Sequence, residues 1–455
     1  MTYSSTVTDR ETVSERRNDS HSKTEKYQSW GRYPRTGHRN VSKVYWRDQL
    51  TETLRNAEPA SLLPYGMGRS YGDSCLNGGR DLLDCAPLDR ILEFDWETGR
   101  ICVEAGTSLG DLLEIIVPRG WFLPVTPGTK FVTVGGAIAN DVHGKNHHRA
   151  GTFGCHVEQI TLHRSDAEPQ VCSPTRNSDL YRATIGGLGL TGVIASAEIQ
   201  LKRVPGNAIE VETLSFQSVD HFLEISATSD QSYEYTVAWV DCLSSPKARG
   251  IFFRGNHAEK SVSFQTTKIR VPFTFPELVL SRPTVGFFNR GYYGLKAGKR
   301  GSALVHYDPF FYPLDSIPNW NRLYGKRGLV QYQCVLPTGS GEVLKSIIEA
   351  VYGSGEACFL AVLKVFGDIE SPGLLSFPRP GLTLALDLPV RGSRTLALLA
   401  SLDELVLASG GTLYPAKDAR MSPSMFKAGF PNWAKFAPFV DPKLSSSFWR
   451  RVMAE

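Results

Sequence analysis

The sequence lacks the features that mark several large classes of protein. None of its eight cysteines forms a Cys-x-x-Cys pair, and no apolar run reaches the ~18 residues of a transmembrane helix. Its N-terminus has no continuous apolar stretch of the secretory type. Neither sign of charge dominates, since 50 basic and 46 acidic residues leave a formal net charge of +4. These absences favour a cytoplasmic protein with reduced thiols and argue against general nucleic-acid binding.

The chain does have enough apolar residues to build an interior. Of its 455 residues 41% are apolar, and a chain of this length is expected to form two or three domains. Residues 1–29 differ, because they contain no Leu, Ile, Phe or Trp and mix charges of both signs. Such a segment buries too little apolar surface to offset its ordering entropy. We therefore expect a disordered tail over 1–29, with order beginning near Trp30.

The N-terminal half alternates short strands, glycine turns and a few helices. The pattern predicts a strand over 101–106, followed by a helix with Thr107 or Ser108 as its N-cap. That helix should end before Pro118, because proline lacks the N–H that a continuing helix needs. Alternating residues predict another strand over 193–201.

The composition changes after residue 205. A strand is predicted over 235–240, and apolar residues at helical spacing predict helices over 344–351 and 395–408. Between them, 271–300 carries three prolines, several aromatic residues and a basic end. Long loops within a domain are usually lids or disordered segments, and we expect an irregular lid loop here.

The segment from Pro64 to Asp73 is the first that points to chemistry. Its three glycines within seven residues permit positive φ angles and close approach of the backbone to a ligand. Successive backbone N–H groups in such a loop form a nest that suits a pyrophosphate. Ser70 adds a hydroxyl donor and Arg69 a positive charge. The alternative interpretation is a glycine-rich surface turn.

A second glycine motif, Gly135-Gly136-Ala137, opens an apolar segment. It predicts the start of a helix packed closely on a ligand, with the N–H donors of the helix N-terminus directed at an anion. A helix packed tightly through small residues is the alternative.

Three histidines and a lysine lie within residues 141–148 and invite the hypothesis of a metal site. Gly144 and Asn146 disfavour a regular helix, so His143 and His147 need not share a face. No carboxylate or cysteine spacing completes a zinc set. A polar cluster beside a cofactor is the favoured interpretation, and no metal is expected.

A dense polar cluster that contains Lys417 and Asp418 follows the strand-like Leu413-Tyr414. Such a pattern is typical of the edge of an active site. The alternative is a solvated charged turn.

In this order, the motifs resemble those of the FAD-linked oxidases of the vanillyl-alcohol oxidase type, and more specifically those of the decaprenylphosphoryl-β-D-ribose 2-oxidase family. The resemblance extends from about Trp30 to Arg420. It rests on the segments 66–73, 126–128, 133–136, 143–148, 308–315, 319–325, 331–333 and 416–418.

The fold that this resemblance implies is a two-domain α+β architecture. A PCMH-type FAD-binding domain would occupy residues 30–205, and a substrate domain with an antiparallel sheet would occupy 206–405, with the lid over 271–300. The segment 406–455 would return to the FAD domain.

The resemblance also implies where the ligands lie. On the catalytic side it places Lys417, His143, Gln333 and Lys364, with Lys417 nearest the reacting hydroxyl. Either Lys417 or His143 would act as the base, and packing on the flavin without proton transfer is the alternative role for His143. The residues implied to bind FAD are Pro64, Gly66, Met67, Gly68, Arg69, Ser70, Tyr71, Gly72, Asp73, Gly128, Thr133, Val134, Gly135, Gly136, His143, Gly144, Lys145, Asn146, Ile194 and Tyr414.

Two positions depart from the wider pattern. Many relatives attach the flavin through a histidine in a Gly-x-Gly-His-Ser loop, where this chain has Arg69. Since arginine does not form that bond, the FAD is expected to be non-covalent. Ala385 stands where the family's best-known members have a cysteine, which implies a different pocket shape beside the flavin.

The activity that the resemblance implies is FAD-dependent oxidation of a sugar secondary hydroxyl. In the family this is C2 of a polyprenylphosphoryl-β-D-ribose, which becomes a 2-keto sugar as the first half of epimerisation to arabinose for the cell wall. The implied partners are this lipid-linked sugar phosphate, a keto-sugar reductase, and oxygen or a quinone as electron acceptor. Peripheral contact with the inner face of the membrane is left open. The alternatives are an aldonolactone or free-sugar oxidase on the same fold, and a flavin-binding protein without catalysis.

Overall fold

The structure is a computed structural model that describes residues 26–265, 269–298 and 301–454. Residues 1–25 of the predicted tail lie outside this range. The last part of that prediction is wrong, because the side chain of Tyr27 is buried and its hydroxyl donates to Asp84 Oδ2 at 2.8 Å. The ring of Tyr27 also packs edge-on against Tyr65, with centroids 5.3 Å apart. One aromatic side chain thus anchors a stretch whose composition alone indicated disorder.

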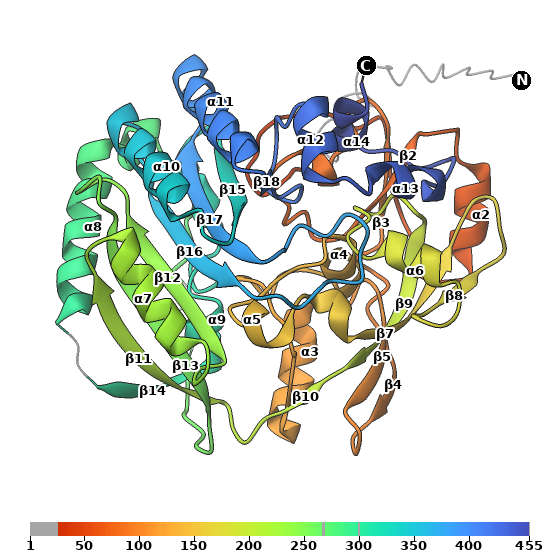
Figure 1. Ribbon diagram of the computed structural model, residues 1–455. Helices are drawn as coiled ribbons and strands as arrows, with labels where there is room; N and C mark the ends of the chain where they lie inside the picture. Colours follow the sequence, from red (N-terminus) through yellow and green to blue (C-terminus); the bar gives the residue numbers. More distant parts are fainter. Residues whose placement is uncertain (1–25, 266–268, 299–300, 455) are drawn as a thin grey trace, which may run out of the picture.

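The N-terminal half of the chain contains two main sheets, seen on the right of Figure 1. Three parallel strands pair in the order β1 (Val41–Lys43), β3 (Asp81–Asp84) and β2 (Leu62–Tyr65). Five antiparallel strands pair in the order β4 (Ile91–Asp95), β5 (Arg100–Glu104), β9 (Val193–Gln200), β7 (Val157–His163) and β8 (Gln170–Cys172). A short ladder joins β6 (Trp121–Phe122) to β10 (Lys202–Arg203). The helices are α2 (Gln49–Asn56), α3 (Leu109–Ile116), α4 (Val134–Ala139), α5 (His147–Ala150) and α6 (Ser178–Thr184).

The following part of the chain forms one antiparallel sheet of eight strands. Their order is β14 (Ser302–His306), β11 (Ala208–Phe216), β13 (Arg249–Ala258), β12 (Tyr235–Asp241), β16 (Leu360–Phe366), β17 (Gly381–Pro389), β15 (Leu329–Pro337) and β18 (Thr412–Leu413). Because successive side chains of a strand point to opposite faces, each strand contributes to two different environments.

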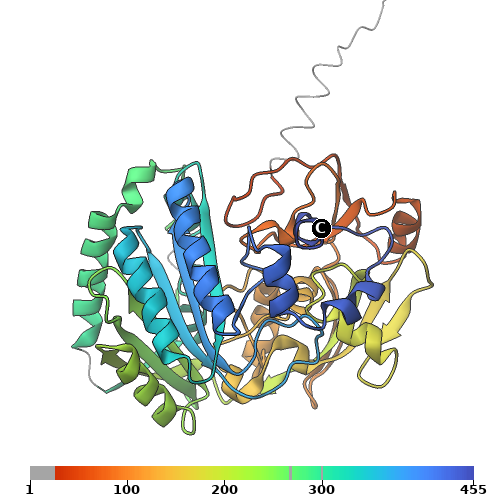
Figure 2. The same ribbon diagram turned by 45° about the horizontal axis from the view of Figure 1, so that its top comes forward.

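Helices cover one face of this sheet, and the other face turns toward the N-terminal half (Figures 1 and 2). The covering helices are α7 (Val219–Ser229), α10 (Gly341–Ser354) and α11 (Ser393–Ala408). Phe222 of α7 packs against Phe216 and Phe252 on the sheet, with ring centroids 5.6 and 5.9 Å apart. These residues belong to the largest apolar core, so the free face of the sheet is available to line a site.

Most of the predicted elements are confirmed. Ser108 is the N-cap of α3, where its side chain accepts a hydrogen bond from Asp111 N. The elements predicted over 101–106, 193–201, 235–240, 344–351 and 395–408 correspond to β5, β9, β12, α10 and α11.

The prediction of an irregular loop over 271–300 is wrong for most of its length. A 3₁₀ turn, η4 (Glu277–Leu280), precedes the 16-residue helix α8 (Arg282–Ala297). Pro283 lies in the first helical turn, where its missing N–H would have no helical partner in any case. Ser281 and Thr284 form a capping box that starts the helix. Neither α8 nor any other helix of the described residues is long and apolar enough to cross a membrane.

The end of the chain lies on the N-terminal half (Figures 1 and 2). It contains α12 (Pro423–Gly429), α13 (Trp433–Phe436) and α14 (Ser447–Val452). Ser445 N donates to Leu62 O at 2.9 Å, and Gly78 N donates to Ser447 Oγ at 2.9 Å. The segment before these helices includes β18 of the large sheet, so the C-terminal region joins both halves.

Candidate active site

A cavity of about 920 Å³ lies between the two halves. The N-terminal half contributes the glycine loop around Gly68, the segment around Thr129 and the polar turn at His143. The large sheet contributes its free face, and the segment Tyr414–Lys417 closes one side. The cavity therefore gathers motifs that are far apart in the sequence.

The glycine loop offers free backbone donors to this cavity. Gly68 has φ +60°, and a Cβ there would lie 1.9 Å from the hydroxyl oxygen of Tyr65. Within the described residues, the backbone N–H groups from Met67 to Ser70 donate to no protein acceptor. The guanidinium of Arg69 lies 4.2 Å from the centre of the Trp30 ring and supplies a positive charge. Unpaired N–H groups beside a cation fit the pyrophosphate of a dinucleotide.

The start of α4 does not supply such donors, contrary to prediction. Thr133 caps the helix by accepting from Gly136 N at 3.1 Å. Gly135 N donates to Ala105 O at 2.7 Å, and a Cβ at Gly135 would lie 2.9 Å from the Cβ of Ala105. Gly135 thus serves close packing of α4 on β5, which was the alternative interpretation of this motif.

His143 lies at the centre of a buried polar cluster. Its Nε2 is 3.0 Å from Gln333 Nε2, and its Nδ1 is 3.1 Å from Lys364 Nζ. Burial and the charge of Lys364 lower the pKa of His143 well below 6.5, so the ring is neutral. A neutral imidazole accepts at one nitrogen only. Either Lys364 is uncharged or Gln333 turns its carbonyl oxygen toward the ring.

The three histidine side chains have different surroundings. Among the residues that the structure describes, no group of three or more His, Cys, Asp or Glu side chains could hold a metal ion. His147 instead packs against Phe366, with ring centroids 4.6 Å apart.

Lys417 also lines the cavity. Its Nζ lies 3.9 Å from the centre of the Tyr71 ring. Burial lowers the pKa of Lys417 to about 8, although the carboxylate of Asp387 opposes this shift. Burial also lowers the pKa of Lys364 to about 7, and the charges of Lys145 and Lys417 add to that effect. Several amines in this cavity therefore titrate near neutral pH.

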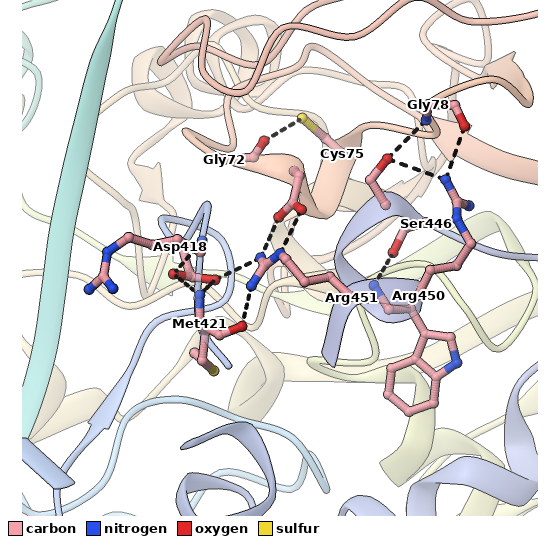
Figure 3. Close-up of polar contacts among 12 residues, drawn as sticks. Gly72, Cys75, Gly78, Asp418, Met421, Ser446, Arg450 and Arg451 are labelled. Atoms are coloured by element: carbon pink, nitrogen blue, oxygen red, sulfur yellow. Dashed lines mark hydrogen bonds and ion pairs between the residues drawn. The ribbon is translucent and has the colours of Figure 1, made fainter. Parts of the chain in front are cut away.

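Figure 3 shows Arg451 of the C-terminal helix reaching Asp418, the residue that follows Lys417 in the chain. Arg451 of α14 donates to Asp73 through Nε at 3.0 Å and Nη2 at 2.7 Å, and to Asp418 Oδ2 at 2.8 Å. Its Nη1 also donates to Met421 O. Gly72 packs so closely that a Cβ there would lie 1.6 Å from Asp418 O. Arg451 thus ties the end of the glycine loop to the segment that carries Lys417.

The cavity brings together all but four of the residues predicted for the site. The exceptions are Gly72, Asp73, Val134 and Asn146. The first two contact the C-terminal segment instead. Val134 is fully buried in the N-terminal core, and the side chain of Asn146 donates to Pro124 O at 2.8 Å.

Two neighbours of the site were missed by the sequence analysis. Gln331 lines the cavity, and its Nε2 donates to Asp387 Oδ1 at 2.5 Å. Burial raises the pKa of Asp387 to about 7. The sequence contained a signal for Gln331, because Gln331 and Gln333 are two residues apart on one strand and therefore share a face. Their cross-strand partners on β17 are Asp387 and Ala385, and Ala385 also lines the cavity.

Comparison with known proteins agrees with this geometry. Residues 47–173 match the family model of an FAD binding domain. The chain is 36% identical over 439 residues to a protein of Mycolicibacterium smegmatis named decaprenylphosphoryl-beta-D-ribose oxidase, covering 92% of this chain and 95% of that one. It is 33% identical to an uncharacterised protein of Streptomyces coelicolor, over 76% of this chain and 99% of the other. L-gulonolactone oxidase of Mus musculus is 32% identical over 30% of each chain. The α+β chain therefore contains an FAD-binding domain, and the free donors of the glycine loop fit that cofactor.

Proposed function

Since the chain belongs to the decaprenylphosphoryl-β-D-ribose oxidase family, we propose that it oxidises the C2 hydroxyl of a polyprenylphosphoryl-β-D-ribose to a 2-keto sugar. As an FAD-dependent oxidoreductase it needs a site where a hydroxyl can lose its proton beside the cofactor. The observation that carries the proposal is the position of Lys417, a partly buried amine with a pKa of about 8 that contacts the glycine loop through Tyr71.

The residues that would hold FAD lie on the N-terminal half. The donors from Met67 to Ser70 would bind its pyrophosphate, and the lining around Gly128, Thr133 and Tyr414 would bind the remainder. Arg69 replaces the histidine that attaches flavin in other oxidases, which supports a non-covalent cofactor. Bound FAD supplies the acceptor for a hydride.

We assign the proton of the reacting hydroxyl to Lys417 Nζ. An amine with a pKa of about 8 is partly uncharged at neutral pH and can take that proton. His143 is less suited to the role, because its pKa is low and both of its ring nitrogens are already within hydrogen-bond distance of Gln333 and Lys364. In this proposal His143, Gln333 and Lys364 bind and orient the sugar.

The remaining partners follow from the family resemblance. A keto-sugar reductase would complete the epimerisation to arabinose, and oxygen or a quinone would accept the electrons. A lipid-linked substrate also requires contact with a membrane, and we place the enzyme peripherally at its inner face. Exposed apolar side chains on and near α8 support this placement, among them Phe287, which is 80% exposed.

The alternative of an aldonolactone oxidase has less support. The similarity to L-gulonolactone oxidase covers only 30% of this chain, whereas that to the decaprenylphosphoryl-beta-D-ribose oxidase covers 92%. A flavin-binding protein without catalysis would have no need of a partly buried lysine with a lowered pKa in its cavity.

An anaerobic absorbance spectrum tests the proposal. Purified protein should show flavin peaks that bleach when polyprenylphosphoryl ribose is added, and acid should release free FAD. Peaks that persist with this lipid but bleach with an aldonolactone would transfer the assignment to the alternative oxidase. Peaks that no alcohol bleaches would indicate a protein without catalysis.

A further inference from the structure

The free face of the eight-stranded sheet changes in character across the cavity. On β15 and β17 it presents Gln331, Gln333 and Thr383. Five strands away from β15, on β11, it presents Val211 and Thr213. The strand order β11-β13-β12-β16-β17-β15 therefore runs from an apolar end to the polar end that faces His143. An amphiphilic ligand would match this gradient, with its head at β15 and its chain toward β11.

We name the apolar end of the cavity the apolar arm. It is lined by Val211, Val237, Trp239, Phe253, Phe288 and Val305. Phe253 pairs across the sheet with Val237 on one side and Thr213 on the other, so their side chains form one row. No charged side chain from β11, β12 or β13 lines the arm.

Helix α8 forms the roof of the apolar arm. Tyr292 packs edge-on against Trp239, with ring centroids 4.8 Å apart, and Phe288 contacts Phe359 at 5.3 Å. The side chain of Asn289 on α8 donates to Asp241 Oδ1 on β12 at 2.9 Å and so holds the helix on the sheet. The arm is therefore closed by the segment in which the sequence predicted a lid.

The outer surface at this roof is also apolar. Phe287 and Leu295 of α8 are 80% and 76% exposed, and Leu278 of η4 is 81% exposed. Soluble surfaces rarely gather such side chains unless they meet a partner or a membrane. Phe288, Tyr292 and Lys296 of α8 thus line the inside of the roof, while Phe287 and Leu295 are exposed on its outside.

We propose that the apolar arm binds the first isoprene units of the lipid chain, while the sugar phosphate lies at the polar end and the outside of α8 contacts the bilayer. This inference rests on the proposed function. The arm is suited to the substrate, because the donors that fit FAD lie on the other half of the molecule. The distance across the sheet from β16 to β11 is roughly 14 Å, because the two strands are three spacings of ~4.8 Å apart. A longer chain must leave beneath α8, where the apolar outer surface receives it.

Photo-crosslinking of the FAD-loaded enzyme tests the location directly. A farnesyl phosphate that carries a diazirine on its chain should label Trp239, Phe253 or Phe288, and unlabelled polyprenyl phosphate should compete. This readout requires binding but no oxidation, so it separates the inference from the proposed activity. Labels confined to the exposed face of α8, or to the N-terminal half, would overturn the inference.

A steric block provides a second test. Val237→Phe fills the arm from the sheet side, and we expect it to lower the ratio of kcat/KM for a long-chain substrate over a methylphosphoryl ribose about tenfold. Leu304→Phe is the matched control, because Leu304 lies on neighbouring β14 and is 40% exposed outside the arm. Equal loss on both substrates in Val237→Phe would contradict the apolar arm while leaving the proposed oxidation intact.

Discussion

Lys417 Nζ lies 3.9 Å from the centre of the Tyr71 ring, and Tyr71 N donates to Ala416 O at 2.9 Å. Two contacts thus join the loop that fits the pyrophosphate of FAD to the amine that we assign as base. Arg451 adds a further link between the same two loops through Asp73 and Asp418. A fixed distance between cofactor and base is a requirement for efficient proton and hydride transfer, since small displacements of reacting groups are costly.

Replacement of Lys417 by Met should reduce kcat about 10²- to 10⁴-fold, because the reacting hydroxyl loses its proton acceptor. FAD content should be retained, since the donors from Met67 to Ser70 are unchanged. The measurement is anaerobic flavin reduction by stopped flow. Lys427→Met is the control, because Lys427 also lies over an aromatic ring, Trp433 at 5.1 Å, but outside the cavity. A Lys417→Met rate within a few-fold of the wild type would remove the base assignment.

The pH dependence should report the same group. If Lys417 must be uncharged, kcat/KM rises with pH and levels off above about 8. The carboxylate of Asp387 stabilises the charged amine and so raises its pKa. Asp387→Asn should therefore lower the pKa of Lys417 and move the rising limb of the profile to lower pH. The exposed Asp368→Asn should leave the limb in place. A shift of the limb to higher pH in Asp387→Asn would contradict this coupling.

The sequence predicted local elements better than the contacts between them. The strand at β5, the cap at Ser108 and the glycine loop each depend on neighbouring residues, and local patterns contain that information. The irregular loop expected over 271–300 was wrong because proline was interpreted as a breaker, although in the first turn of α8 it is compatible with a helix.

The missed parts of the site depend on long-range pairing. Asp387 meets Gln331 only because β15 and β17 are neighbours in one register. Arg451 contacts Asp73, which lies 378 residues earlier in the chain. Neither partner has a local signature, since an arginine in a C-terminal helix is ordinarily solvated. The same limit explains why the donors at the start of α4 were expected to be free, when distant Ala105 accepts from one of them.

Cofactor binding should be sensitive to a single methyl group in the glycine loop. In Gly68→Ala the added carbon would collide with the Tyr65 hydroxyl, so the loop must move and its N–H donors lose their arrangement. We expect at least a tenfold weaker affinity for FAD, measured by the flavin-to-protein absorbance ratio and by titration of the apoprotein. Gly79→Ala is the matched control, because Gly79 also has positive φ (+69°) but no atom within 4 Å of an added Cβ. Equal loss of FAD in both variants would indicate backbone strain instead of a cofactor contact.

Arg451 should be needed for both stability and turnover. The carboxylates of Asp73 and Asp418 are only 5% and 4% exposed, and Arg451→Met would leave both without their cation. Removing one partner of a buried ion pair costs about 3–5 kcal/mol, so the free energy of unfolding in urea should fall by roughly that amount. Arg450→Met is the control from the same helix, because Arg450 donates to the neutral Asn77, Gly78 and Ser445 instead of a carboxylate.

Arg451→Lys tests whether Arg451 positions Lys417, at a lower cost in stability. The lysine ammonium keeps the positive charge but cannot donate to Asp73, Asp418 and Met421 in the geometry of the guanidinium. We expect it to lower kcat more than FAD affinity, because Lys417 would no longer be held over Tyr71. A folded Arg451→Lys enzyme with wild-type kcat would restrict Arg451 to a structural role.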